Sequence, residues 1–196
     1  MRLLVVTAVA AERDAIDHAD VLVGGVGPAA SAAATSAALA RDRFDLVLSA
    51  GIGGGFGPLV PGDIAVAATI AFADLGADSP HGFLALDLAE DRYEVEAALA
   101  VLLADRTGGH LGTILTVATV TGTAAGADAL LARYPDAVAE GMEGAGVAAA
   151  ARLHGVAFGE VRAISNAVGP RDRAAWQIPQ ALAALGTAVT AVTAGS

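Results

Sequence analysis

Short, continuous apolar runs alternate along this chain with alanine-rich segments of helical length, and this alternation constrains the fold most. The runs LLVVTAV near the N-terminus, VLVGGVG at 21–27, DLVLSAG at 45–51 and IAVAATIAFAD at 64–74 lack the polar alternation of half-exposed strands. Strands of this kind are buried on both faces, as in parallel sheets covered by helices. We therefore predict an α/β fold with three layers, α/β/α, around a central mixed, largely parallel sheet.

The rest of the chain continues this alternation. The other elements expected are helices over 92–105, 124–133, 144–154 and about 174–194, and strands beginning near 111 and 156. Residues 52–58, with four glycines, and residues 74–91 are expected to be loops, and loops as long as the second one are uncommon unless they are functional or disordered. We see no internal repeat and no linker, so residues 1–196 are expected to form a single domain.

Composition excludes several classes of function. The formal net charge of −10 argues against nucleic acid or an anionic membrane surface as a partner. The chain has no cysteine, so neither a disulfide framework nor thiolate chemistry is available. The N-terminal MRLLVVTAVAA imitates a short signal peptide but has the length of a strand, and no uninterrupted apolar stretch reaches the roughly 18 residues of a membrane-spanning helix. We expect a soluble, cytoplasmic protein.

Polar side chains stand where apolar strands end. Glu143 follows the predicted strand AVAEGM, and Asn166 ends the strand VAFGEVRAIS. Ligands of open α/β sheets bind beyond the carboxyl ends of the strands, which makes both residues candidates for a site. Glu12 opens a short helix after the first strand, where a carboxylate also simply complements the helix dipole, and Asn166 is equally a common turn residue.

Glycine turns separate these polar residues. Gly24, Gly25 and Gly27 precede a helix that opens at Pro28, a geometry that presents backbone N–H groups to an anion or a polarised water, or forms a tight turn with no ligand. The four histidines, at 18, 81, 110 and 154, have no metal-ligand spacing, and no G-x-S-x-G motif occurs, so we expect no metal and no serine hydrolase. Paired carboxylates suit chemistry through a cationic, sugar-like transition state.

Six motifs together resemble the purine nucleoside phosphorylase/nucleosidase superfamily along nearly the whole chain. They are VAAE at 9–12, GVG at 25–27, SAGIGG at 49–54, PGD at 61–63, GMEG at 141–144 and RAISN at 162–166. Within the superfamily the chain is most similar to the futalosine hydrolases of the alternative menaquinone pathway. The segments that carry this likeness are FADLGADS at 72–79, ILTVATVTGT at 114–123 and AISNAVGPRDRAAWQI at 163–178.

The resemblance implies a nucleoside phosphorylase-like fold, no cofactor, and hydrolysis of futalosine by water to dehypoxanthine futalosine and hypoxanthine. Glu12 would take a proton from the attacking water, and Glu143 would hold the ribose hydroxyls and counter positive charge on the sugar. Asn166 would contact the purine. The other residues expected to bind the substrate are Val26, Met142, Gly53, Thr119, Val120 and Ser165.

Two departures from the superfamily pattern refine this expectation. Adenosine-type nucleosidases carry Asp where this chain has Asn166, and an amide is no general acid but offers both a donor and an acceptor, which suits a 6-oxopurine. Residues 24–36 contain none of the arginines that surround phosphate in the phosphorylases, which favours water as the nucleophile. The resemblance leaves open which group protonates the leaving purine.

The loop after Asn166 carries candidate contacts for the benzoate of futalosine. Arg171 is the predicted partner of the carboxylate, with Arg173 as a second candidate, although a solvated loop charge beside Asp172 is the simpler explanation. Trp176 is expected to be a core residue, with a cover over the aromatic part of the substrate as the alternative. We expect a homo-oligomer, and the alternative functions are a methylthioadenosine/S-adenosylhomocysteine nucleosidase and a purine-binding module without catalysis.

Overall fold

The computed structural model describes residues 2–17, 19–86 and 90–194; His18 and part of the predicted loop 74–91 lie outside the described residues. The strands are β1 (Leu3–Thr7), β2 (Asp20–Val23), β3 (Leu46–Gly55), β4 (Ile64–Phe72), β5 (Gly76–Ala77), β6 (Leu84–Ala85), β7 (Arg92–Glu94), β8 (His110–Thr116), β9 (Ala137–Gly141) and β10 (Ala157–Ala167). The helices are α1 (Ala10–Arg13), α2 (Pro28–Leu39), α3 (Ala97–Thr107), α4 (Ala124–Arg133), α5 (Gly144–Leu153) and α6 (Ile178–Thr193), with a short 3₁₀ turn η1 (Arg173–Ala175).

The central sheet is mixed and largely parallel, which confirms the predicted sheet. Its strands follow the order β10-β4-β8-β9-β3-β1-β2, and β7 pairs with β4. Strand β3 is long enough to pair with β1 through its first half and with β9 through its last two residues, while its other edge pairs with β10. Because β10 also pairs with β4, the strands β3, β10, β4, β8 and β9 close on themselves.

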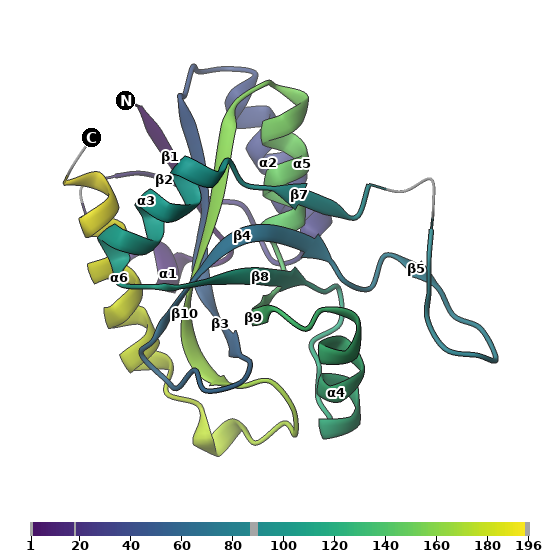
Figure 1. Ribbon diagram of the computed structural model, residues 1–196. Coiled ribbons are helices and arrows are strands. Elements are labelled where there is room, and N and C mark those ends of the chain that lie inside the picture. Colours follow the sequence, from purple (N-terminus) through teal and green to yellow (C-terminus); the bar gives the residue numbers. More distant parts are fainter. Residues whose placement is uncertain (1, 18, 87–89, 195–196) are drawn as a thin grey trace.

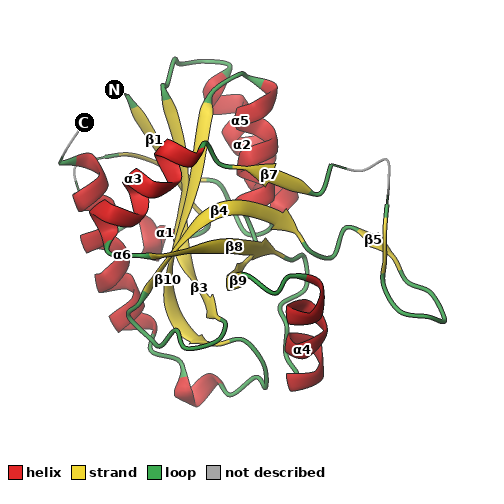
Figure 2. Ribbon diagram, in the orientation of Figure 1, coloured by secondary structure: helices red, strands yellow, loops and turns green. Residues whose placement is uncertain are grey.

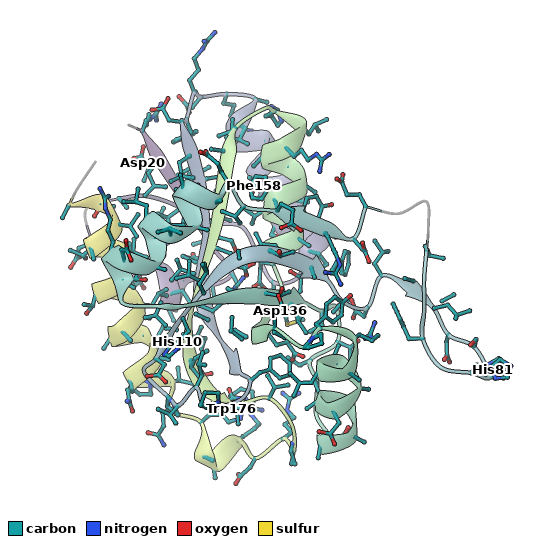
Figure 3. All side chains as sticks on the ribbon, viewed as in Figure 1. Asp20, His81, His110, Asp136, Phe158 and Trp176 are labelled. Atoms are coloured by element: carbon teal, nitrogen blue, oxygen red, sulfur yellow. The ribbon has the colours of Figure 1, made fainter. Side chains whose placement is uncertain are left out.

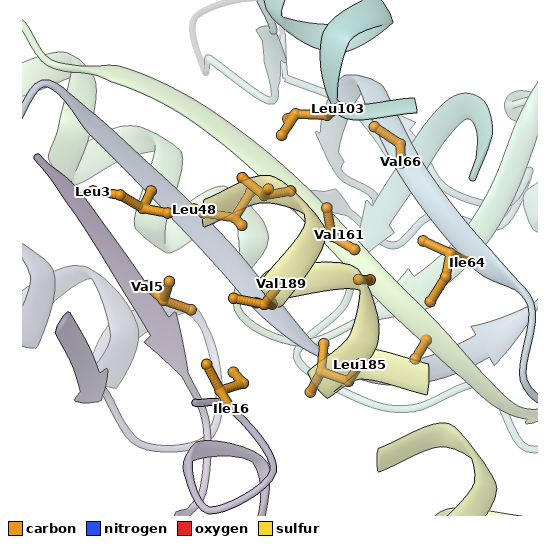
Figure 4. Close-up of a cluster of buried hydrophobic side chains, with 14 of the residues drawn as sticks. Leu3, Val5, Ile16, Leu48, Ile64, Val66, Leu103, Val161, Leu185 and Val189 are labelled. Atoms are coloured by element: carbon orange, nitrogen blue, oxygen red, sulfur yellow. The ribbon is translucent and has the colours of Figure 1, made fainter. Parts of the chain in front are cut away.

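Helices cover both faces of the sheet (Figure 1), as the continuous apolar strands require. Helices α3 and α6 lie on one face and α2 and α5 on the other, which the colouring by secondary structure makes plain (Figure 2). On the first face, Leu185 and Val189 of α6 pack against Leu48 of β3 and Val161 of β10 (Figure 4). On the second face the two helices approach closely, since a Cβ on Gly146 would lie 2.2 Å from the carbonyl oxygen of Pro28.

The N-terminal apolar run forms β1, every residue of which is buried. It pairs in parallel with β2 on one side and β3 on the other. The run is therefore a strand in the core of the sheet, as expected from its length. Among the described residues, no helix is both long enough and apolar enough to cross a membrane.

Three local predictions were wrong. Residues 53–55, expected in a loop, continue strand β3, because the absence of side chains lets β9 and β10 approach: a Cβ on Gly53 would lie 2.6 Å from the carbonyl oxygen of Glu140. Residues 92–94 form the edge strand β7 rather than a helix, since Tyr93 is buried against the sheet. The final helix begins at Ile178, after η1, and not near residue 174.

Candidate active site

A pocket of about 250 Å³ opens where β1, β3, β9 and β10 end. These are the carboxyl ends of the strands, the place at which α/β sheets bind ligands. Its lining residues are Ala8, Val9, Glu12, Val26, Ile52, Gly53, Gly54, Val120, Thr121, Glu140, Gly141, Met142, Glu143, Ser165, Asn166, Ala167, Val168, Gly169, Pro170, Arg171 and Trp176. The lining thus includes every residue predicted for the site except Thr119.

Glu12 lies at one end of the pocket and is 4% exposed. Its Oε2 accepts hydrogen bonds from the backbone N–H groups of Ala8 at 2.9 Å and Val9 at 3.3 Å, so the side chain reaches back to the start of its own helix. Its Oε1 accepts from the N–H of Ile52, on β3, at 2.9 Å. Three backbone donors from two segments therefore hold this carboxylate in one orientation.

Glu143 lies beside the glycine turn that precedes α2. Its Oε1 accepts from the N–H of Gly27 at 3.1 Å, and the hydroxyl of Ser31 donates to its carbonyl oxygen at 3.1 Å. Gly27 has a φ of 91°, a conformation that glycine adopts without strain. The anion that meets this helix N-terminus is therefore a carboxylate of the protein itself.

Arg162 joins the carboxylates of this end, and the sequence did not suggest a role for it. The side chain is 1% exposed; it lies 3.1 Å from Oε2 of Glu143 and 2.8 Å from Oε1 of Glu160, and it donates to Ser49 Oγ at 3.1 Å. Burial alone would lower the pKa of Arg162, but the nearby carboxylates of Glu160, Glu143 and Glu12 raise it above its ordinary value. The one signal that could have identified it is its position, an arginine in the middle of a strand of apolar residues, which would indicate a buried ion pair.

Gly51 separates Glu12 from Arg162. A Cβ at this position would lie 2.5 Å from Nη1 of Arg162 and 2.7 Å from Oε1 of Glu12, so both groups pack directly against the backbone of Gly51. Any larger residue would push the carboxylate and the guanidinium away from the pocket. Glycine at this point of β3 therefore leaves the space that the carboxylate and the guanidinium occupy.

Ser165 and Asn166 lie at the other end of the pocket. The hydroxyl of Ser165 lies 2.7 Å from Oδ1 of Asn166 and 3.1 Å from the carbonyl oxygen of Gly53. The amide nitrogen of Asn166 donates to the carbonyl oxygen of Ala167 at 2.9 Å. One N–H of the Asn166 amide is thus bonded within the chain, and the second N–H stays available as a donor.

A further carboxylate, Glu140, lines the same end and was not predicted. It is 4% exposed, and its two oxygens accept from the N–H of Thr121 at 2.9 Å and from the hydroxyl of Thr121 at 2.5 Å. Burial raises the pKa of Glu140, against the lowering effect of the Thr121 hydrogen bonds. Its position two residues before Met142 gave no sequence signal that distinguishes it from a strand residue.

The rim contains the predicted benzoate contacts. Arg171 lines the pocket, and the guanidinium groups of Arg171 and Arg173 each lie 5.7 Å from the ring of Trp176. Trp176, labelled in Figure 3, also lines the pocket, so the prediction that it is a core residue was wrong. Thr119 lies outside the lining, with its N–H directed to Asp74, and Thr121 takes its place.

None of the three histidines that the structure describes lines the pocket. Figure 3 shows His81 at the tip of the hairpin of β5 and β6, and His110, the first residue of β8, on the opposite side of the view. His154 caps the end of α5 and contacts Ser36 of α2 at 3.0 Å. Among the described residues, the ionisable side chains that line the pocket are therefore those of Glu12, Glu140, Glu143 and Arg171.

Comparison with known proteins places the chain in a family. A model of the Phosphorylase superfamily matches residues 18–194. The futalosine hydrolase of Streptomyces coelicolor is 49% identical over 220 residues, which cover 96% of this chain and 94% of that protein. The futalosine hydrolase of Acidothermus cellulolyticus is 47% identical over 222 residues, which cover 99% of this chain and 91% of that protein.

Solved structures show the same fold at low sequence identity. A 5'-methylthioadenosine/S-adenosylhomocysteine nucleosidase from Neisseria meningitidis superposes with a TM-score of 0.87 at 18% identity and covers 100% of this chain and 99% of that one. A futalosine hydrolase of Helicobacter pylori superposes with a TM-score of 0.84 at 17% identity, covering 100% and 98%. The predicted nucleoside phosphorylase-like fold is thereby confirmed, and the chain belongs to the Phosphorylase superfamily and, within it, to the futalosine hydrolases.

Proposed function

We propose that this protein is a futalosine hydrolase, an N-glycosidase that cleaves futalosine with water and releases hypoxanthine. The observation that carries the proposal is one pocket in which a buried carboxylate–arginine cluster faces an amide. Glu12, Glu143 and Arg162 form the cluster, and Asn166 supplies the amide. The near full-length identity to curated futalosine hydrolases supports the same activity.

The cluster suits activation of water and support of a cationic sugar. Glu12, oriented by three N–H donors, accepts a proton from the water whose oxygen bonds to C1′ of the ribose. As the N-glycosidic bond breaks, its electron pair leaves with the purine, and positive charge grows on the sugar. Glu143 lies on the same side of the pocket and offsets that charge while accepting from the ribose hydroxyls.

Arg162 keeps the carboxylates close together. The buried carboxylates of Glu143 and Glu160 repel one another, and the guanidinium of Arg162, which pairs with both, offsets this repulsion. Because Arg162 also approaches Glu12 across Gly51, it lies beside the place where the attacking water would stand. We assign it as a positioning residue for the two catalytic carboxylates.

The opposite end binds the base. Asn166 donates from its NH₂ group to N7 or O6 of the purine, which stabilises the leaving group by hydrogen bonding and not by proton transfer. Ser165 holds the amide in this orientation, and Gly53 and Val120 line the walls. Val26 and Met142 line the sugar-facing side.

Water is the proposed nucleophile, and two observations favour it over phosphate. The N-terminus of α2 directs the N–H of Gly27 to Glu143, so this donor is already bonded to an anion. The segment 24–36 brings no arginine to the turn. A phosphate dianion would meet the carboxylates of Glu12 and Glu143 with little cationic compensation, whereas a neutral water molecule would not.

The benzoate of futalosine would lie at the rim. Arg171 offers a guanidinium for the carboxylate, and Trp176 offers a ring face for the aromatic part. We further propose that the enzyme acts in menaquinone biosynthesis, in the cytoplasm, as a homo-oligomer. The solved nucleosidases share only the fold at their level of identity, so we do not propose methylthioadenosine as the substrate.

The test is the release of free base by purified protein, followed by chromatography without phosphate. Futalosine, inosine and methylthioadenosine are compared at equal concentration. We expect hypoxanthine from futalosine and little from inosine, since inosine lacks the benzoate side chain. Adenine from methylthioadenosine would contradict the assignment of Asn166, and release that requires added phosphate would show a phosphorylase.

A further inference from the structure

Glu160 is a buried carboxylate behind the candidate active site, and the proposed mechanism gives it no role of its own. It comes from the first half of β10, is 0% exposed and lies outside the lining of the pocket, so a substrate does not reach it. Its Oε1 accepts from Nε of Arg162 at 2.8 Å, and its Oε2 has no hydrogen-bond partner among the described residues. Burying a carboxylate in this way costs stability, which calls for a functional explanation.

The register of β10 places Glu160 beside the base of the Arg162 side chain. The two residues are two positions apart on one strand, and Glu160 pairs with Ser49 of β3. Side chains two positions apart on a strand, and those paired across neighbouring strands, share a face of the sheet. The carboxylate, the guanidinium and the hydroxyl of Ser49 therefore meet on one face.

Each nitrogen of the guanidinium of Arg162 has a different acceptor. Nε donates to Glu160, and Nη2 donates to Ser49 Oγ at 3.1 Å. Nη1 lies 3.1 Å from Oε2 of Glu143 and approaches Glu12 across Gly51. Because a guanidinium is planar, two nitrogens that are held fix the direction of the third. Glu160 and Ser49 thus determine where Nη1 lies relative to the carboxylates that line the pocket.

Glu160 also packs against the start of α5. A Cβ on Gly144, the first residue of this helix, would overlap Oε2 of Glu160. Gly144 directly follows Glu143, so the buried carboxylate supports the backbone next to the residue proposed to hold the ribose. The first turn of α5 contains no acidic residue, and the partial positive charge of the helix N-terminus therefore favours the charged form of Glu160.

The charge of Glu160 reaches the pocket through Arg162. Burial raises the pKa of Glu160, the guanidinium of Arg162 lowers it, and the carboxylate of Glu143 raises it further. The same guanidinium is acted on by three carboxylates, those of Glu160, Glu143 and Glu12. One cation is thus shared among three anions, and a change of charge at one of them alters the compensation that the other two receive.

We propose that Glu160 is a positioning residue that acts through Arg162 on the two carboxylates of the reaction. It anchors the guanidinium at Nε, so that Nη1 stays beside Glu143 and close to Glu12. This inference rests on the proposed function and adds to it a residue outside the pocket that sets the geometry and the charge of the sugar-facing end. Because Glu160 touches no substrate, its removal should affect the chemical step and not the binding of the base.

Two substitutions separate the contact of Glu160 from its charge. Glu160→Gln keeps an oxygen that accepts from Nε and removes the charge, whereas Glu160→Met keeps the length of the side chain and removes both. The control is Glu94→Gln, since the carboxylate of Glu94 lies on the exposed edge strand β7, where it accepts from the hydroxyl of Thr69 at 2.8 Å. For each variant, kcat and KM for futalosine are measured across pH, with inhibition by hypoxanthine. Thermal unfolding checks that each variant folds.

We expect Glu160→Met to lower kcat roughly 10- to 100-fold, the size of a lost hydrogen bond to a charged group, with little change in KM or in inhibition by hypoxanthine. Glu160→Gln should lose less, because its oxygen still anchors Nε. The acid limb of the pH profile of kcat/KM should move to lower pH in Glu160→Gln, since the guanidinium then serves two carboxylates instead of three. Glu94→Gln should change none of these quantities.

A purely structural role would give a different result. Activity that falls only with the folded fraction, with an acid limb at the wild-type pH in Glu160→Gln, would overturn the inference while futalosine hydrolysis stands. A rise in KM without a fall in kcat would also overturn it, since Glu160 would then act on binding. If Glu160→Met does not fold, the acid limb of Glu160→Gln decides, because that variant keeps the shape and the hydrogen bond. Absence of hydrolysis by the wild type would refute the proposed function, and this inference with it.

Discussion

The two ends of the pocket hold buried carboxylates in opposite electrostatic surroundings. At the end that contains Glu143, the buried guanidinium of Arg162 lies 3.1 Å from one carboxylate oxygen, and backbone N–H groups bind both oxygens. At the end that contains Glu140, Thr121 is the one donor among the described residues, and the charged group that acts on the pKa of Glu140 is another acid, Asp74. One strand, β3, passes through both ends and uses glycine at each of them, Gly51 and Gly54.

This difference divides the buried carboxylates into two kinds. A group that must act on water has to keep one orientation and one charge throughout the reaction, and the cluster around Arg162 provides both. A buried carboxylate that has no cation costs stability for as long as it is charged. The following predictions test this division, from the largest expected effect to the smallest.

Glu12→Gln should reduce hypoxanthine release by roughly 10²- to 10⁴-fold, because an amide cannot accept the proton of the attacking water. Binding of the substrate should persist, since the loss concerns the chemical step. Single-turnover assays and calorimetry separate the two quantities. The matched control is Asp14→Asn, an exposed carboxylate two residues away that pairs with Arg13, and it should retain full activity. Turnover by Glu12→Gln at the wild-type rate would remove Glu12 from the mechanism.

Arg162→Met should lower the free energy of unfolding by about 3–5 kcal/mol, because the buried carboxylates of Glu143 and Glu160 lose their shared cation. Urea unfolding measures this change. The double variant Arg162→Met/Glu160→Gln should recover part of the loss, since it removes one of the two uncompensated charges. Suppose instead that adding Glu160→Gln to Arg162→Met lowers the free energy of unfolding as much as Glu160→Gln does in the wild type. The two residues would then contribute independently and not as a pair.

Glu140→Gln should raise the free energy of unfolding at pH 7. Burial raises the pKa of Glu140 above 4.5, so the folded state binds this proton more tightly than the unfolded chain does. Its contribution to stability is therefore present below pH 4.5 and is lost as the pH rises through the folded pKa. A neutral glutamine avoids that loss, so the difference from the wild type should disappear in acid.

Urea unfolding at neutral and acidic pH measures this effect, with Glu94→Gln as the control for an exposed carboxylate. A destabilised Glu140→Gln at pH 7 would mean that Thr121 compensates the charge fully. Burying a carboxylate would then cost no stability at either end of the pocket.

Arg171→Ala should raise the KM for futalosine by about 3- to 10-fold and leave kcat unchanged, since an exposed ion pair contributes about 0–1 kcal/mol and aromatic contact adds to it. The matched control is Arg173→Ala, whose guanidinium lies at the same 5.7 Å from Trp176 but outside the pocket lining. Kinetics at two salt concentrations check the electrostatic origin. Equal effects of both substitutions would assign the contact to Trp176 and not to a particular arginine.

Much of the fold could be predicted from local pattern. The apolar runs became β1, β3 and β4, and the helix predicted over 124–133 has those bounds as α4. The prediction failed at residues 53–55, where the run of glycines suggested a loop. Their conformation depends on pairing with β9 and β10, which lie far away in the chain. Patterns of neighbouring residues carry no information on such distant strands. That residues 1–196 form one domain stays a prediction.

The candidate site likewise contains some residues that the sequence predicted and others that it missed. Glu143 and Asn166 stand at strand ends, so their position indicated a site, whereas Glu12 was identified through the resemblance to the superfamily. The structure gathers all three in one pocket. Their roles, and those of Val26, Met142 and Ser165, stay predictions for the experiments above. Arg162, Glu140 and Trp176 had no such mark, because their significance depends on which strands become neighbours.

The sequence by itself determined the class of fold, the order of its elements and the residue types at the strand ends, since these follow from apolar periodicity and from turn chemistry. Only the tertiary structure decided that Arg162 balances Glu143 and Glu160, and that Glu140 faces the pocket in the row of Asn166. The physical reason is that burial and charge compensation are properties of pairs of groups. Strand pairing at long sequence separation creates those pairs, and the local pattern of residues does not encode it.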